Sequence, residues 1–205
     1  MRKIAILGGT FNPVHNGHIR LALSCHEELK FDKILVVPTN VPPHKETPDL
    51  CSNSDRMEMC RLAVKDMPVF EVSDIEYRLG GRSYTVNTLR VLKKEYPDAS
   101  FYLLVGSDMF FSFRQWRSYQ EILKVCTLVG ASRNFEEHRK MLEMSASFKR
   151  EGFSTIVIKN DVYVLSSTEL RRLMKEHKDI SAYVNPDVLR YIEEHSLFGG
   201  GVVDV

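Results

Sequence analysis

Short apolar runs alternate with longer amphipathic stretches along most of this chain. The runs are rich in Ile, Leu and Val, as buried strands are. We expect strands over residues 3–7, 33–38, 69–75, 101–105, 124–130 and 155–158. The stretches between them carry apolar residues at helical spacing behind capping residues. We expect helices over residues 17–30, 52–64, 84–96, 167–177 and 186–195.

The alternation of strands and helices predicts the fold class. It favours a mainly parallel sheet with helices on both faces and right-handed crossovers. We therefore expect an α/β fold, a single Rossmann-like doubly wound domain over residues 1–198, with residues 199–205 as a flexible tail. Ligands of such sheets bind beyond the carboxyl ends of the strands. This places the functional site in the loops after Leu7, Pro38, Val105 and Gly130.

Composition narrows the classes of partner. The 205 residues are 43% hydrophobic and 27% charged, with a formal net charge of +1. A net charge this small produces no general positive electrostatic field that would attract nucleic acid or anionic lipid. No apolar run approaches the roughly 20 residues of a spanning helix, and the scattered cysteines favour reduced thiols. We expect a cytoplasmic globular protein without nucleic-acid or membrane partners, and the sequence leaves a homo-oligomer open.

The loop after the first predicted strand, G-G-T-F-N-P-V-H-N-G-H over residues 8–18, carries the strongest chemical signal. Gly8 and Gly9 allow a tight turn and close approach of a ligand to the backbone. The helix that begins near Gly17 presents free N–H groups and the positive end of its dipole, which together bind anions. His15 and His18 are close enough in the chain for both rings to reach that region. Imidazoles there can donate hydrogen bonds to phosphoryl oxygens, more strongly when protonated.

Other interpretations of this loop imply different chemistry. The segment lacks the G-x-x-x-x-G-K-[ST] pattern of a Walker loop and the G-x-G-x-x-G pattern of dinucleotide-binding folds. The H-x-x-H pair could be half of a zinc site, although no clear set of further ligands accompanies it. A tight turn with incidental histidines is the remaining alternative. Two glycines, a hydroxyl and two histidines between a strand and a helix fit it poorly.

The segment around Ser166 and Ser167 predicts a second anion site. Either serine can cap a helix whose first amides face an anion, with Arg171 about one turn further on. A guanidinium can hold two phosphate oxygens at once. The alternative is an ordinary cap followed by a solvated arginine.

Three further residues each have more than one interpretation. Trp116, the only tryptophan, is either a core residue or a flat face for a ligand among polar neighbours. Asp108 follows a predicted central strand, where it could hold ribose hydroxyls, help to organise Mg²⁺ or only cap a helix. Lys45, in a proline-rich loop, is either close to a substrate phosphate or solvated.

The motif G-G-T-F-[DN]-P-x-H-x-G-H resembles the signature of the nucleotidyltransferase superfamily that carries H-x-G-H. Further matches follow in the expected order over nearly the whole chain. They are P-P-H-K over residues 42–45, S-Y-T over 83–85, G-S-D over 106–108 with Trp116, S-S-T-E-L-R over 166–171, and P-D-V-L-R-Y-I over 186–192. Among these, P-P-H-K, S-Y-T and Trp116 point to one family. The chain resembles the bacterial nicotinate mononucleotide adenylyltransferases.

This resemblance implies transfer of AMP from ATP to nicotinate mononucleotide by direct in-line attack, a step of NAD biosynthesis. It implies that His15, His18 and Arg171 are catalytic, with His18 on the α-phosphate. The ATP-binding residues that it implies are Gly8, Gly9, Thr10, Phe11, Gly106, Asp108, Arg133, Ser167 and Thr168. The substrate-binding residues are Thr39, Lys45, Tyr84, Thr85 and Trp116, with Trp116 stacked on the pyridine ring. Mg²⁺ is the expected cofactor, held mainly by phosphates with no direct protein ligand.

Two positions depart from the family pattern. Asn12 stands where many members have Asp, so a metal site that needed this carboxylate would be impaired. Thr39 stands where we expected Asn, which is instead residue 40.

Competing functions come from several classes. They are another enzyme of the superfamily, such as a pantetheine-phosphate adenylyltransferase or a cytidylyltransferase, a fragment of a class I aminoacyl-tRNA synthetase, a nucleotide-binding module without turnover, and a zinc-binding structural module. The choice between acid and amide on the pyridine ring is open from the residues alone, and family resemblance favours the acid.

Overall fold

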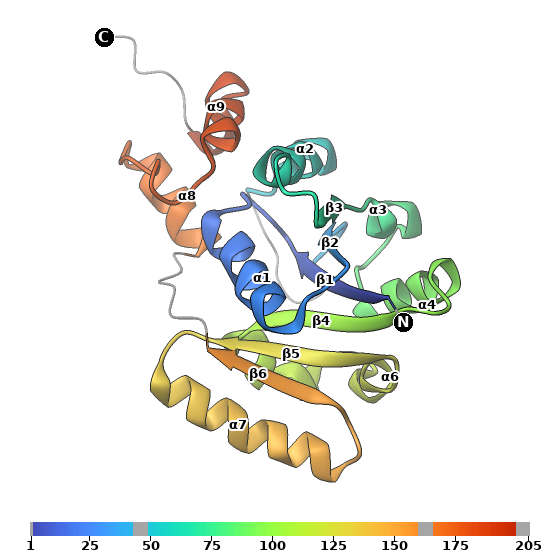
Figure 1. Cartoon of the computed structure of the whole chain (residues 1–205). Helices are drawn as coiled ribbons and strands as arrows, with labels where there is room; N and C mark the ends of the chain where they lie inside the picture. Colours follow the sequence, from blue (N-terminus) through green and yellow to red (C-terminus); the bar gives the residue numbers. More distant parts are fainter. Residues whose placement is uncertain (1, 43–48, 160–165, 200–205) are drawn as a thin grey trace.

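The computed structural model of this chain describes residues 2–42, 49–159 and 166–199. Within this part, a parallel sheet has the strand order β3-β2-β1-β4-β5-β6 (Figure 1). The strands are β1 (Lys3–Gly9), β2 (Lys33–Pro38), β3 (Phe70–Val72), β4 (Ser100–Gly106), β5 (Cys126–Ser132) and β6 (Thr155–Lys159). The order reverses between β1 and β4, the switch point at which such sheets bind ligands. The predicted Rossmann-like α/β fold is confirmed.

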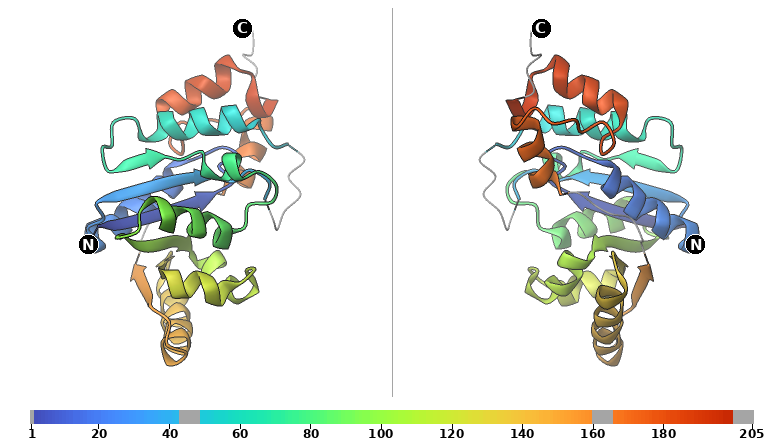
Figure 2. Two further views of the ribbon diagram at one scale, coloured as in Figure 1. Left: turned by 90° about the vertical axis from the view of Figure 1, so that its right-hand side faces the viewer. Right: turned by 90° about the vertical axis from the view of Figure 1, so that its left-hand side faces the viewer.

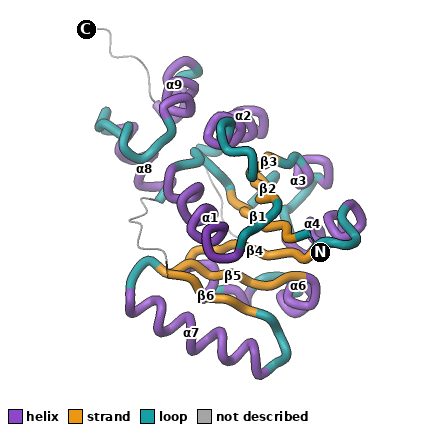
Figure 3. The backbone as a smooth tube through the Cα atoms, viewed as in Figure 1, coloured by secondary structure: helices purple, strands orange, loops and turns teal. Residues whose placement is uncertain are grey.

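Helices cover both faces of the sheet (Figures 2 and 3). Alternate strand residues contribute to two hydrophobic cores, one on each side of the sheet. In β1, Ala5 and Leu7 belong to one core, and Ile4 and Ile6 to the other. The first core is shared with α1 (Asn16–Leu29), α2 (Asn53–Val64), α8 (Ser167–Lys175) and α9 (Pro186–Glu194). The second is shared with α3 (Ile75–Leu79), α4 (Thr85–Glu95), α5 (Ser107–Phe111), α6 (Tyr119–Val125), α7 (Phe135–Arg150) and the 3₁₀ turn η1 (Phe113–Gln115).

The predicted helices are found with small shifts at their ends, and two of the predicted strands are corrected. The strand expected over residues 69–75 is shorter, because β3 ends at Val72 and Ile75 begins α3 with its side chain fully buried. The strand expected over residues 124–130 begins later, at Cys126, because Lys124 and Val125 complete α6.

The long helix α7 was not expected from the sequence. Its apolar stripe is sparse, with Met141 and Phe148 among its few buried residues. Its ends carry the signals that could have revealed it. Asn134 accepts a hydrogen bond from the backbone N–H of Glu137, and basic residues occupy the last turn.

Three other expectations concern the tail of the chain, membrane-spanning helices and the cysteines. Gly199 closes the 3₁₀ turn η2 (Leu197–Gly199), and the rest of the expected tail lies outside the described residues. None of the described helices combines the length and apolarity needed to cross a membrane. All four cysteines are free thiols.

Candidate active site

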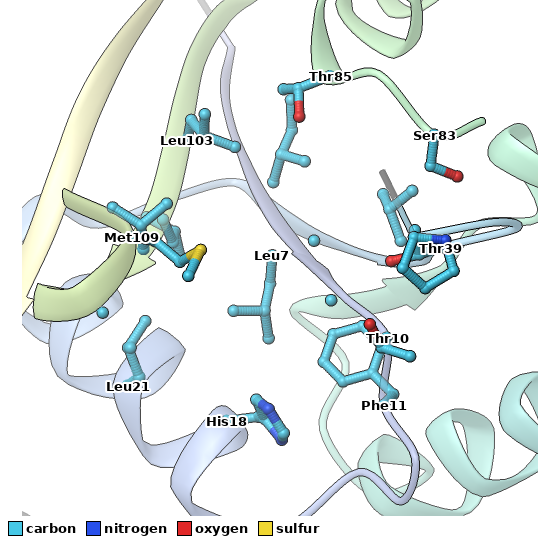
Figure 4. Close-up of a pocket in the computed structure, with 18 of the residues that line it drawn as sticks. Leu7, Thr10, Phe11, His18, Leu21, Thr39, Ser83, Thr85, Leu103 and Met109 are labelled. Atoms are coloured by element: carbon cyan, nitrogen blue, oxygen red, sulfur yellow. The ribbon is translucent and has the colours of Figure 1, made fainter. Parts of the chain in front are cut away.

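A cavity of about 430 Å³ lies beyond the carboxyl ends of β1, β2, β4 and β5 (Figure 4). Its wall also includes the starts of α1, α4 and α8. In Figure 4, His18 and Thr85 lie on different sides of the cavity, with Leu7 between them. The structure brings together all the predicted site residues that it describes, namely Gly8, Gly9, Thr10, Phe11, His15, His18, Thr39, Tyr84, Thr85, Gly106, Asp108, Trp116, Arg133, Ser167, Thr168 and Arg171. Lys45 lies outside the described residues.

We had expected the loop after β1 to turn at the two glycines, but it turns at Phe11. Gly8 and Gly9 remain in β1, opposite Val37 and Pro38 of β2, whereas Phe11 adopts the left-handed region with φ 49°. Gly9 is required for another reason, since a Cβ there would stand 2.9 Å from the Phe11 ring. A Cβ on Gly8 would meet nothing within 4 Å, so this part of the backbone stays open to a ligand.

His15 and His18 lie against each other at the start of α1. His15 is the N-cap residue, and the two rings stack with their centroids 3.7 Å apart. The backbone N–H of His15 points at Nδ1 of His18, with 3.3 Å between the nitrogens. Because Nδ1 accepts this bond, a neutral His18 carries its proton on Nε2. The Phe11 ring also packs on this imidazole, with 5.0 Å between the centroids and 80° between the ring planes.

Burial keeps both histidines in their neutral form. It lowers the pKa of His15 to about 4. Burial, and then the neighbouring His15, lower the pKa of His18 well below its ordinary value. At neutral pH both rings are therefore uncharged hydrogen-bond donors. A bound polyphosphate would raise both pKa values again, because a nearby anion favours imidazolium.

Helix α8 brings the second predicted set of donors to the same place. The Oγ of Ser166 accepts from the backbone N–H of Glu169 at 3.2 Å and so caps the helix. Arg171 donates to the Asn12 carbonyl at 2.7 Å across 159 positions of sequence, and Ser167 donates to the Pro13 carbonyl at 3.0 Å. At the start of α1, the backbone N–H of Asn16 donates to the Tyr183 carbonyl at 2.8 Å and that of His18 to the His15 carbonyl at 3.0 Å. The starts of α1 and α8 thus bring the two histidine rings together with the donor side chains of Ser167 and Arg171.

Asp108 and Arg133 form an ion pair at the ends of β4 and β5, with 2.7 Å between Oδ2 and Nη2. The Arg133 guanidinium lies over Gly106, where a Cβ would be 3.7 Å from Nη2. The cap of α5 is Gly106, and Asp108 occupies its first turn. Since exposed pairs contribute little to stability, both side chains are free to exchange partners when a ligand arrives.

Thr39, Tyr84, Thr85 and Trp116 line the cavity at the β2 and α4 side. Tyr84 is the N-cap residue of α4, so the first amides of that helix lie close to the cavity. Trp116 is half-buried and packs against Phe113 with 4.9 Å between centroids. This tryptophan packs on the core and also lines the cavity, and its role toward a ligand stays a prediction.

Arg56 is a residue that sequence reasoning missed. Its side chain is fully buried in α2, and its guanidinium donates to the carbonyls of Thr10 at 2.9 Å and Thr39 at 2.6 Å. It also donates to the Cys51 carbonyl at 3.2 Å. These bonds tie the loop after β1 to the loop after β2, which are two walls of the cavity. An arginine among the apolar positions of a predicted helix was the available signal.

Glu76 is a second residue that was missed. This buried carboxyl lines the cavity and accepts from the Thr88 hydroxyl at 2.9 Å. Burial raises the pKa of Glu76, while hydrogen bonds from Ser83 and Thr88 act in the opposite direction. Ser83 in turn accepts from the backbone N–H of Asn40 at 2.8 Å. The carboxyl therefore fixes the loop that precedes α4.

Asn12 uses its whole side-chain amide in loop-to-loop bonds. Nδ2 donates to the Asp49 carbonyl at 2.8 Å, and Oδ1 accepts from the Cys51 backbone N–H at 3.0 Å. An aspartate could accept the second bond but could not donate the first. The departure from the family pattern thus has a structural use in this chain.

Carboxylates that could face a metal ion are few in this cavity. Asp108 and Glu76 are the acidic residues of its described lining. Within the ranges that the structure describes, no group of three or more His, Cys, Asp or Glu side chains is arranged to hold a metal ion. An ion such as Mg²⁺ would fit here with oxygen ligands supplied largely by a polyphosphate and water.

A parallel sheet with two stacked histidines at its switch point is the arrangement expected of the nucleotidyltransferase superfamily that the motifs resemble. The chain belongs to the cytidylyltransferase-like family, whose model matches residues 6–173. It is 36% identical over 198 residues to a probable nicotinate-nucleotide adenylyltransferase of Desulfitobacterium hafniense, covering 96% of each chain. It is 37% identical to one of Hydrogenovibrio crunogenus, covering 96% of this chain and 98% of the relative. Within the class, it is a member of the nicotinate-nucleotide adenylyltransferase family, which confirms the resemblance drawn from its motifs.

Solved structures show the same fold. One is a nicotinic acid mononucleotide adenylyltransferase of Plasmodium falciparum complexed with NaAD, with a TM-score of 0.80 at 20% identity, covering 98% of this chain and 100% of that one. Another is a putative nicotinate-nucleotide adenylyltransferase of Vibrio parahaemolyticus, with a TM-score of 0.70 at 24% identity and 98% of each chain covered.

Proposed function

We propose that this protein transfers AMP from ATP to nicotinate mononucleotide, giving nicotinate adenine dinucleotide and pyrophosphate. The observation that carries the proposal is the meeting of His15, His18 and Arg171 in a cavity that extends to Trp116 and Tyr84. The first group suits a polyphosphate, and the second suits a flat ring. Residues 1–198 would form one catalytic domain, with 199–205 as a tail, acting on these small molecules in the cytoplasm.

The proposed chemistry needs positioning and charge stabilisation but no protein nucleophile. The 5′-phosphate of the mononucleotide is already an anion and attacks the α-phosphorus of ATP, while the bond to pyrophosphate breaks. Nε2 of His18 would donate to the α-phosphate, where negative charge builds up. His15, Thr10 and Arg171 would hold the remaining phosphates, for which Arg171 exchanges its bond to the Asn12 carbonyl.

The remaining roles concern the nucleoside and the metal. Gly106, Asp108 and Arg133 would hold the adenosine part, since the ion pair lies at the ends of β4 and β5. Mg²⁺ is the proposed cofactor and would supply positive charge between phosphate oxygens. Thr39, Tyr84, Thr85 and Trp116 would bind the mononucleotide, together with Lys45.

The first test measures pyrophosphate release from ATP and Mg²⁺ with three acceptors, which are nicotinate mononucleotide, nicotinamide mononucleotide and phosphopantetheine. We expect rapid release with the nicotinate compound. Release with phosphopantetheine alone would keep the chemistry and reject the substrate. Nucleotide binding by folded protein without any release would reject catalysis.

The companion variant is His18→Ala. Losing one well-placed donor to the developing charge should lower kcat roughly a hundredfold, with a smaller effect on the KM for ATP. Near-normal turnover in this variant, shown by circular dichroism to be folded, would contradict the role of His18.

A further inference from the structure

The three described arginines that line the cavity differ in how their charge is compensated. Arg133 is paired with Asp108. Arg171 donates to backbone carbonyls and to Thr168, and has no carboxylate partner among the described residues. Arg117 also has no carboxylate partner there, unlike many other arginines of the chain. Two guanidiniums that form no ion pair with a described carboxylate therefore face one cavity, and each can attract an anion.

Arg117 lies at the end of the cavity occupied by the start of α4. Its guanidinium carbon is 4.5 Å from the centroid of the Tyr84 ring, in a cation–π arrangement. The side chains of Arg82 and Arg117 both contact the Tyr84 hydroxyl by hydrogen bonding and lower its pKa. Arg82 is likewise without a carboxylate partner in the described part of the chain. The contacts with Tyr84 thus place two guanidinium groups, those of Arg82 and Arg117, beside the first amides of α4.

The acidic groups of the described lining do not cancel this charge. Asp108 is held by Arg133. Glu76 accepts from Thr88 and is buried beneath the loop that carries Ser83. The region around Arg117 therefore offers net positive charge next to Trp116, the flat residue that the proposed function assigns to the pyridine ring.

We infer that Arg117, supported by Arg82 at the Tyr84 hydroxyl, is a specificity-determining residue that selects a pyridine ring bearing a carboxylate over one bearing a carboxamide. The inference rests on the proposed function and extends it, because the amides of α4 can bind either group, whereas a guanidinium favours the charged one. Arg171 would meet the phosphates, and Arg117 would meet the second anionic group of the acceptor.

The test compares Arg117→Gln with the unaltered protein in steady-state kinetics. Nicotinate mononucleotide and nicotinamide mononucleotide are each supplied as acceptor with saturating ATP and Mg²⁺. Where amide turnover is too slow to measure, its inhibition constant against the acid replaces it. We expect the ratio of kcat/KM for acid over amide to fall about five- to tenfold, through a higher KM for the acid alone. Arg117→Lys, which keeps the charge, should recover part of the loss.

The matched control is Arg90→Gln. It also removes one positive charge, but from α4 and away from the cavity. Arg90 is exposed, pairs with Glu121 and does not line the cavity. This variant should keep the ratio within about twofold. The acid preference should also weaken with added salt in the unaltered protein, because a partly exposed guanidinium is screened.

The outcomes separate the two proposals. An unchanged ratio in Arg117→Gln, with normal turnover of the acid, overturns the inference and leaves the proposed function intact. An equal rise in KM for both acceptors would mean that Arg117 binds their common phosphate, which also overturns it. Unaltered protein that is inactive with the acid overturns the proposed function and the inference together.

Discussion

His15 and His18 show how single residues in this site are prepared by their surroundings. Their rings are stacked and neutral, with His15 buried and His18 half-buried, and Nδ1 of His18 is occupied by the backbone of His15. His18 thus keeps Nε2 as a defined donor, and neither ring carries a charge that burial would oppose. Arg56 solves a related problem, since its buried charge is surrounded by carbonyl oxygens from two loops.

The lowered pKa of His15 predicts a pH dependence of stability. Unfolding returns its pKa from about 4 to the ordinary 6.5, so below pH 6.5 the unfolded chain binds a proton that the folded chain does not. The free energy of unfolding should therefore fall as the pH drops from 6.5 to 4, by about 3 kcal/mol from this residue. Urea unfolding over this range would measure it.

The variant His15→Asn isolates the contribution. Its unfolding free energy should depend less steeply on pH between 6.5 and 4 than that of the unaltered protein, by about one proton. Parallel curves for the two proteins would show that burial of His15 has no such effect.

At the scale of secondary-structure elements, two helix starts converge from distant parts of the chain. The start of α1 carries the histidines, and the start of α8 carries Ser167 and Arg171. The bonds from Arg171 to Asn12 and from Ser167 to Pro13 join them. The geometry of the proposed phosphate site therefore depends on the integrity of α8.

Ser166→Ala tests this dependence through the helix cap. Removing the acceptor for the Glu169 N–H should destabilise the protein by about 1 kcal/mol. Because α8 carries the proposed phosphate ligands Ser167 and Arg171, the KM for ATP should rise while that for nicotinate mononucleotide stays nearly unchanged. Thermal unfolding and steady-state kinetics measure the two effects.

The matched control is Asn185→Ala, which removes the cap of α9. In the unaltered protein, Oδ1 of Asn185 accepts from the Asp187 N–H at 2.8 Å. Since α9 carries no residue of the cavity lining, this variant should lose similar stability without a change in KM. A rise in the KM for ATP in both variants would point to general loosening of the fold.

On the scale of the whole molecule, the cavity draws its walls from segments along most of the chain. Residues near positions 8, 39, 84, 106, 133 and 171 meet there. A ligand that contacts them in the folded state alone must stabilise the fold, by an amount set by its concentration relative to its Kd.

We therefore predict that ATP with Mg²⁺ raises the melting temperature. At a concentration of about 100 times Kd the gain is about 2.7 kcal/mol, or roughly 5–10 °C for a chain of this size. Differential scanning calorimetry measures the shift. Inorganic triphosphate at equal concentration should give a smaller shift, and an equal shift would contradict recognition of the nucleoside.

The sequence by itself determined the strand–helix alternation, the position of the cavity in the loops after the strands, and a set of polar lining residues that includes His15, His18 and Arg171. Apolar periodicity, capping residues and the G-G-T-F-N-P-V-H-N-G-H segment are local features, so they can be interpreted without tertiary contacts. The helix α7 was missed because its stripe of buried residues is too sparse to stand out.

Tertiary structure alone decided which groups meet and in what state. The turn at Phe11 depends on packing against Gly9 and His18, and the neutral histidines depend on burial. Arg56 gained its role only when distant loops supplied its partners, and Glu76 only when α4 placed Thr88 against it. These properties arise from contacts between segments far apart in the chain, where desolvation and hydrogen bonding, and not local propensity, set the energy.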